Sequence, residues 1–203
     1  MKREQVRRRL AIEPYTQWEE GVESPGSACG PATMAALTEY WNSRQGVRQV
    51  RGKKAFGSRA AHINHIYRHH GGRPWGMSVH GFTKGLKAYL AESLPLEELR
   101  GRLSIRTLTD IAQYKAEIDA GRPVAVKFDK WFHFRWRGRY AYDYHWVMGM
   151  GYEEPAGGFG PVLIVHDNGV RYRDGSFARG QERLIDYESN QEIMTMVAVN
   201  IKI

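Results

Sequence analysis

Residues 24–41 read Ser24-Pro-Gly-Ser-Ala-Cys-Gly-Pro-Ala-Thr-Met-Ala-Ala-Leu-Thr-Glu-Tyr-Trp41. Within this stretch Met34, Leu37 and Trp41 recur at three- and four-residue spacing, which is typical of an amphipathic helix. Turn-forming residues surround the expected start of this helix, at Pro25, Gly26, Gly30 and Pro31. We therefore predict a helix over about 29–42 that begins at Cys29, the single cysteine of the chain.

The position of Cys29 at a helix start affects the chemistry of its thiol. Unpaired backbone N–H groups and the positive end of the helix dipole favour the thiolate, which is the nucleophilic form of cysteine. An inert buried thiol is the alternative, since free cysteine is among the most buried residue types. Partner residues elsewhere in the chain are needed to choose between these two interpretations.

A histidine and an acidic or amide residue follow Cys29 in the order used by cysteine peptidases. His145 lies in the apolar run Tyr144-His-Trp-Val-Met-Gly-Met-Gly-Tyr152, which predicts a buried strand. His133 is a rival, but its neighbours lack that buried, glycine-rich context. Asp167 or Asn168, after the apolar run 161–165, could orient the imidazole, although Asp167-Asn-Gly169 is also a turn signal.

Five segments together resemble the papain-like cysteine peptidases of the bacteriocin-processing (double-glycine peptidase-like) type. They follow the order of that family and span most of the chain: Glu13-Pro-Tyr-Thr-Gln17, Ala28-Cys-Gly-Pro-Ala-Thr-Met34, Asp119-Ala-Gly-Arg-Pro-Val-Ala-Val126, His145-Trp-Val-Met-Gly-Met-Gly-Tyr152 and Val165-His-Asp167. The resemblance implies an α+β fold, in which N-terminal helices carrying the nucleophile pack on a C-terminal antiparallel sheet.

The same resemblance implies roles for four residues. Cys29 is expected to be the nucleophile, His145 the general base, Asp167 the residue that orients the imidazole, and Gln17 the side-chain donor to the oxyanion. The implied reaction is hydrolysis of a peptide or amide bond through a thioester acyl-enzyme, without a cofactor. Gln17 lies twelve residues before Cys29, a longer spacing than the six to eight residues expected for the family.

Three other functions remain open at this stage. The same residues could transfer an acyl group to an amine, as in transglutaminase-like relatives. The longer Gln17 spacing could indicate a catalytically degenerate domain that binds peptides. A net charge of +8 could indicate nucleic-acid binding, but the basic residues are spread along the chain. We therefore expect a peptide or protein substrate, with acidic surfaces favoured and no nucleic-acid partner.

Size and composition are consistent with a single domain over residues 1–203. A chain of 203 residues with 42% hydrophobic residues can bury one substantial core. Residues 1–12 are expected to be a loose basic arm or a short helix. A single cysteine excludes an internal disulfide.

No signal peptide or membrane span is recognisable in the sequence, so the chain as written is expected to be cytoplasmic. Relatives of this type are often exported or fused to transporters. If the sequence given is a trimmed form of a longer protein, secretion is expected instead.

The remaining patterns predict mainly helices in the first part of the chain and mainly strands in the second. Helices are expected over 58–70, with Ser58 as its cap, over 83–93, and up to residue 120, with Thr109 or Asp110 as its cap and Gly121 after its end. Strands are expected over 104–108, 124–126, 145–153, 161–167 and 194–202. The alternating aromatics of 131–136 predict a strand or hairpin arm, with its rings either in the core or lining a groove. His62, His65, His69 and His70 share helical spacing, which indicates an exposed helix face or a metal site.

Overall fold

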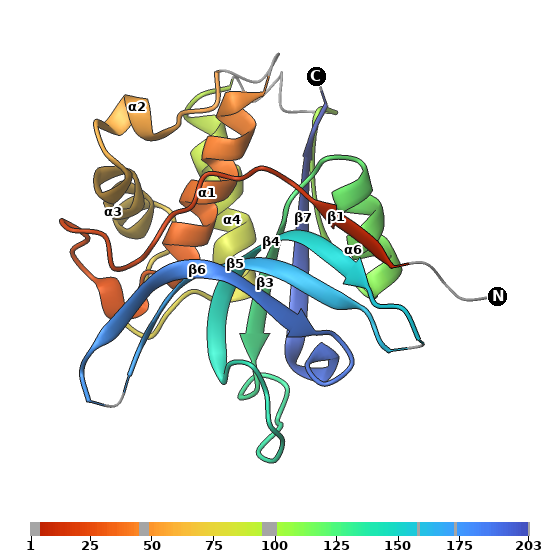
Figure 1. Ribbon diagram of the computed structural model, residues 1–203. Helices are drawn as coiled ribbons and strands as arrows, with labels where there is room; N and C mark the ends of the chain where they lie inside the picture. Colours follow the sequence, from red (N-terminus) through yellow and green to blue (C-terminus); the bar gives the residue numbers. More distant parts are fainter. Residues whose placement is uncertain (1–4, 45–48, 95–100, 158, 173, 203) are drawn as a thin grey trace.

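Helices dominate the first half of the chain and strands the second, as Figure 1 shows. The computed structural model describes residues 5–44, 49–94, 101–157, 159–172 and 174–202. Its helices are α1 (Cys29–Ser43), α2 (Lys53–Phe56), α3 (Arg59–His69), α4 (Val79–Ala91) and α6 (Ile111–Asp119), with short 3-10 turns at Pro25–Ser27 and Gln191–Ile193. Its strands are β1 (Val6–Arg9), β2 (Leu103–Leu108), β3 (Val124–Asp129), β4 (Tyr144–Glu154), β5 (Val162–Arg171), β6 (Phe177–Asp186) and β7 (Met194–Ile201).

In the described residues the strands form one antiparallel sheet with the order β2-β7-β3-β4-β5-β6. The long strand β4 pairs with β3 over its first half and with β1 over its second half. Its other side pairs with β5, with a register shift between Gly149 and Gly151. The middle of the sheet therefore holds β4, the strand that carries His145.

The two faces of the sheet are covered by different helices. Because successive side chains of a strand point to opposite faces, Val124 and Val126 pack in the cluster that contains α6, whereas Ala125 packs in the cluster that contains α1, α3 and α4. Helix α1 is buried over almost its whole length, between the sheet and the other N-terminal helices. Since one sheet serves both cores, we propose that the described residues form a single domain.

Several local predictions are confirmed at their expected positions. Helix α1 begins at Cys29 and ends at Ser43. The Ser58 side chain accepts a hydrogen bond from the Ala61 amide at the start of α3, and Asp110 accepts one from Gln113 at the start of α6. Gly121, at φ +73°, follows the end of α6 and begins the short connection to β3. None of the helices in the described ranges is long and apolar enough to cross a membrane.

The prediction for the N-terminal arm is wrong over residues 6–9, while residues 1–4 lie outside the described part of the chain. Instead of a helix or a loose arm, these residues form β1, which is antiparallel to β4 from Gly151 to Glu154. Strand pairing supplies backbone hydrogen bonds that a basic tetrapeptide cannot obtain alone. The sequence of residues 6–9 does not reveal that β4 extends beyond β3 and leaves an edge there with which these residues can pair.

The prediction for residues 131–136 is also wrong. This segment is a turn after β3, and its four large aromatic rings are exposed: Trp131, Phe132, Phe134 and Trp136. Trp75, from another loop, is also exposed. The Asp129 carboxylate accepts a hydrogen bond from the Phe132 amide at 3.0 Å, and the Asp129 carbonyl accepts one from the His133 amide. These bonds turn the chain away from the sheet, so the alternating aromatics do not belong to a strand.

Gly30 is required by the close approach of α1 to its neighbours. A Cβ atom at this position would lie 2.8 Å from the Cβ of Met77 and 3.3 Å from the Trp146 ring. We therefore expect Gly30→Ala to lower the free energy of unfolding by about 1–3 kcal/mol, the usual cost of overpacking, despite the better helix propensity of alanine. Urea denaturation measures this change.

Gly26→Ala is the matched control, because a Cβ atom there would have no neighbour within 4 Å. Equal stability of the two variants would show that Met77 moves aside without cost.

Candidate active site

Cys29 is the first residue of α1 and is almost fully buried. The preceding 3-10 turn, Pro25–Ser27, directs the chain into the helix, and Ala28 at the N-cap provides no side-chain cap. The backbone N–H groups of Gly30 and Trp146 form hydrogen bonds with the Cys29 sulfur. The thiol thus faces backbone donors at the positive end of a helix.

His145 and Asp167 are brought together by the pairing of β4 with β5. In this register Asp167 lies opposite Val147, two residues from His145 on the same face of the sheet. The diagonal contact places Nε2 of His145 at 2.9 Å from Oδ1 of Asp167. The Cys29 thiol interacts with the same imidazole, and Nδ1 is the ring nitrogen left for it.

The Asp167 carboxylate is buried and has several hydrogen-bond donors. Oδ1 also accepts from the Gly169 amide at 2.9 Å, while Oδ2 accepts from the Tyr142 hydroxyl at 2.7 Å and from Arg183 at 3.3 Å. Burial alone would raise the pKa of Asp167, but the hydrogen bond and charge of His145 outweigh it and hold this pKa well below its usual range. Asp167 is therefore ionised at neutral pH.

Asn168 points away from the imidazole. Its side-chain nitrogen lies 3.1 Å from the Cys29 carbonyl oxygen, 2.7 Å from the Thr33 hydroxyl and 2.9 Å from the Trp146 carbonyl oxygen. Of the two candidates in the sequence, the structure thus places Asp167 against His145 and uses Asn168 to attach α1 to the sheet.

Gln17 is buried in the wall of the same cavity as Cys29 and His145. Its side-chain nitrogen donates to the Pro25 carbonyl at 2.7 Å, and its backbone amide donates to the Asn168 carbonyl at 2.9 Å. A primary amide carries two hydrogens, so the bond to Pro25 leaves the second one available. The long loop between Gln17 and Cys29 returns on itself through these contacts.

The cavity above the thiol has a volume of about 680 Å³. Its aromatic wall includes Trp18, which stacks on Phe177 with ring centroids 4.9 Å apart, and Trp75, whose side chain is largely exposed. In the part of the chain that the structure describes, the exposed aromatics of residues 131–136 do not line this cavity. The expectation that the aromatics of residues 131–136 line a groove therefore does not hold for the cavity beside Cys29.

Lys127 is a charged neighbour of the site that the sequence analysis missed. Its ammonium group is buried, donates to the Met77 carbonyl at 2.9 Å, contacts Asp129 at 3.1 Å and lies 4.0 Å from the Tyr144 ring centroid. The only sequence signal is a lysine within the otherwise apolar β3 segment Val-Ala-Val-Lys-Phe.

Comparison with known proteins assigns the chain to a family. The model of the peptidase C39-like family matches residues 9–179. The chain belongs to this family. It is therefore a cysteine peptidase, and its N-terminal helices on a C-terminal antiparallel sheet are the expected α+β, papain-like arrangement.

Among solved structures, the chain is similar to the peptidase domain of Streptococcus ComA, a bi-functional ABC transporter involved in a quorum sensing pathway. The sequence identity is 11%, the TM-score is 0.46, and the match covers 87% of this chain and 93% of the other. No curated protein matches the sequence.

The charges of this C39-like peptidase favour an ion pair between thiolate and imidazolium. Burial would raise the pKa of Cys29, but the hydrogen bond and charge of His145 lower it below its ordinary value. Burial would also lower the pKa of His145, but its bonds to Asp167 and Cys29 raise this pKa to about 9. The ion pair is thus populated at pH values between the two pKa values.

The rate of Cys29 alkylation by iodoacetamide, measured against pH, tests this ion pair. Because the Cys29 pKa is lowered, we expect the rate to reach its plateau at a pH below the free-thiol value of about 8.5. His145→Ala should move the inflection upward, since the stabilising charge is lost. A wild-type inflection near 8.5 that His145→Ala leaves in place would contradict the ion pair.

Proposed function

We propose that the chain hydrolyses peptide bonds through a Cys29–His145–Asp167 triad and a thioester acyl-enzyme. The observation that carries this proposal is the convergence of a helix-start thiol, an imidazole and a buried carboxylate from α1, β4 and β5. Each group has the protonation state that its role requires: a lowered thiol pKa, a raised imidazole pKa and an ionised carboxylate.

The reaction follows from these protonation states. The Cys29 thiolate attacks the scissile carbonyl carbon, and the electron pair of the C=O bond moves to oxygen. When the tetrahedral intermediate collapses, His145 donates its Nδ1 proton to the departing amine and the thioester forms. His145 then accepts a proton from water as the water oxygen attacks the thioester carbonyl carbon. The C–S bond breaks, which releases the acid product and restores the Cys29 thiolate beside the His145 imidazolium. Asp167 holds the ring through Nε2 in both steps.

Gln17 and the Cys29 backbone N–H are proposed to stabilise the oxyanion. Support comes from the Gln17 side chain, which lines the cavity beside Cys29 and keeps one amide hydrogen free of Pro25. Its anchoring to Pro25 and Asn168 orients the donor before substrate arrives, which is what makes such donors effective.

A preference for acidic peptides is the finer part of the proposal. It rests on the net charge of +8, which raises the local concentration of acidic substrates at low salt. Hydrolysis of acidic peptides should therefore weaken with added salt more than hydrolysis of neutral peptides of equal length.

The two alternatives on the same scaffold have less support. The long Gln17 spacing favours a degenerate binding domain, whereas the position of Gln17 in the cavity wall beside Cys29 supports a working site. Acyl transfer would use the same thioester and differ only in the acceptor. Adding a primary amine during turnover distinguishes amide formation from hydrolysis.

Acid-quench mass spectrometry with a peptide library tests the triad. We expect an acyl adduct on Cys29 during turnover, no cleavage by Cys29→Ala, and a strongly lowered cleavage rate for Asp167→Ala because the imidazole loses its orientation and charge partner. Asp174→Ala, an exposed aspartate in the turn before β6, is the matched control and should cleave normally. Full activity of Asp167→Ala would exclude the triad.

Gln17→Ala tests the oxyanion assignment separately. Its turnover rate should fall by roughly a hundredfold or more, the usual cost of losing one oxyanion donor. Cys29 alkylation should remain nearly unchanged, since the thiol pKa is lowered mainly by His145 and by the backbone amides of Trp146 and Gly30. A turnover rate equal to that of the wild type would assign the oxyanion to backbone donors alone.

A further inference from the structure

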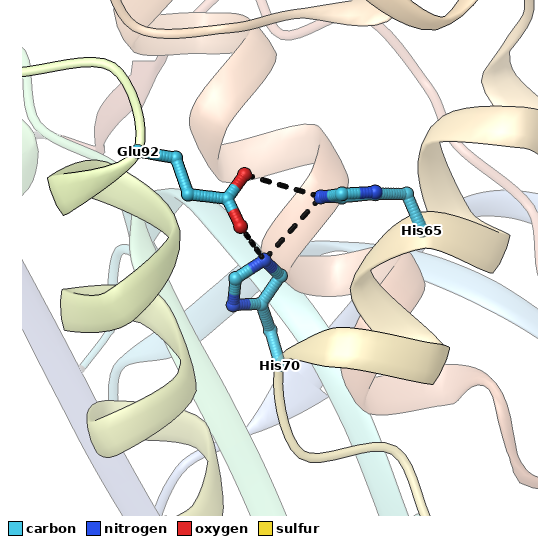
Figure 2. Close-up of side chains that lie close together, drawn as sticks. All are labelled: His65, His70 and Glu92. Atoms are coloured by element: carbon cyan, nitrogen blue, oxygen red, sulfur yellow. Dashed lines mark hydrogen bonds and ion pairs between the residues drawn. The ribbon is translucent and has the colours of Figure 1, made fainter.

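Three side chains on the helical side of the molecule direct their polar atoms at one point (Figure 2). His65 belongs to α3, His70 follows directly after α3, and Glu92 follows directly after α4. The Nε2 atoms of His65 and His70 are 3.4 Å apart. Glu92 places Oε2 at 3.2 Å from His65 and Oε1 at 3.0 Å from His70.

These separations match the ligand spacing of a tetrahedral zinc site. Zinc binds histidine nitrogens and carboxylate oxygens at about 2.0–2.1 Å, so two ligand atoms of a tetrahedron lie about 3.3–3.4 Å apart. The two Nε2 atoms are 3.4 Å apart, and each lies 3.0 or 3.2 Å from one oxygen of the Glu92 carboxylate, so each of these pairs has nearly the spacing of two ligand atoms of such a tetrahedron. An ion can therefore be bound with small side-chain movements.

Glu92 offers a separate oxygen to each imidazole, so both Nε2–H groups can donate to the carboxylate when no ion is bound. The 3.4 Å contact between the two nitrogens then holds no hydrogen bond. A bound cation would instead accept a lone pair from each of these nitrogens.

The surroundings hold the carboxylate and the imidazoles in place. His70 is buried and His65 is half-buried. Arg51 donates to Oε2 of Glu92 at 2.8 Å and leaves Oε1 toward His70. Hydrogen bonds of this kind commonly hold ligating carboxylates in place.

We propose that His65, His70 and Glu92 bind a zinc-class divalent transition-metal ion. Two imidazoles and one carboxylate form a set of three protein ligands that suits zinc, with the fourth position open to water. The neighbouring His69 is exposed, and its ring centroid lies 4.9 Å from that of His65. Its imidazole could take the fourth position in place of water.

The position of this site assigns the metal a structural role. The ion would join the C-terminal ends of α3 and α4, two helices that both pack against α1 in one core cluster. This role is independent of the triad, because none of the three ligands lines the cavity that contains Cys29. The spacing of the histidines indicates an exposed helix face or a metal site, and the structure adds the Glu92 carboxylate from the end of α4.

Isothermal titration of tag-free protein with zinc chloride tests the site. The Cys29→Ser background removes the thiolate as a competing zinc ligand. We expect a single ion per chain and no comparable binding of Mg²⁺, which prefers oxygen ligands. Glu92→Gln and His65→Asn should each weaken zinc binding by more than the roughly 10–100-fold that loss of an outer-shell partner costs.

His80→Gln is the matched control, since His80 is an exposed histidine on α4 outside the cluster. It should bind zinc like the background protein. Circular dichroism establishes that each variant is folded, and two ligand variants keep the test available should one fail to fold.

Thermal unfolding gives a second readout. Zinc should raise the unfolding temperature of the Cys29→Ser and His80→Gln proteins in a concentration-dependent way, and should not raise that of Glu92→Gln or His65→Asn. Zinc binding that survives both ligand substitutions would show adventitious binding at surface histidines. That result, or the absence of zinc binding, would overturn the proposal.

Discussion

The side-chain amide of Asn168 connects the three elements on which the site depends. It lies on β5, beside Asp167, and reaches the first turn of α1 through the Cys29 carbonyl and the Thr33 hydroxyl, and β4 through the Trp146 carbonyl. Because the contacts are fully buried, an unpaired amide or carbonyl there would cost about 1–3 kcal/mol. The start of α1 therefore has little freedom to move relative to the strands.

This connection explains how groups from opposite faces of the sheet meet. His145 and Asp167 share the face that packs with α6, whereas α1 covers the other face. A thiol in the middle of α1 would be separated from the imidazole by the sheet. At its first residue, beside the first residues of β4, the thiol lies where the two faces meet. The helix start provides both the electrostatic environment of Cys29 and its access to His145.

The sequence predicts well what depends on neighbouring residues. The periodicity after Cys29, the caps at Ser58 and Asp110 and the glycine at 121 lead to the correct helices because each signal acts within a few residues. The order of Cys29, His145 and Asp167 also suggests the candidate site, although only the strand register decides between Asp167 and Asn168.

Features formed by distant segments are those that the sequence does not reveal. Strand β1 exists because β4 is longer than β3, and residues 131–136 leave the sheet because Asp129 caps a turn. The histidines after Ser58 were expected on an exposed helix face or at a metal site, yet His62 and His70 are buried. The carboxylate beside His65 and His70, Glu92, comes from another helix end, and helix periodicity carries no information about such a contact.

The burial of α1 also relates the helical layer to the chemistry of the thiol. Residues 29–39 of α1 are buried, so α3 and α4 form the outer wall that keeps this helix against the sheet. His62 of α3 lies within hydrogen-bond distance of Thr38 in α1 and of Tyr89 in α4, at 3.3 and 2.8 Å. A buried hydrogen-bonded histidine of this kind resists protonation, and burial lowers its pKa to about 3. The same layer that excludes water from α1 thus keeps the buried His62 imidazole neutral, so that this ring connects α3 to α1 and α4 by hydrogen bonds without introducing a buried charge.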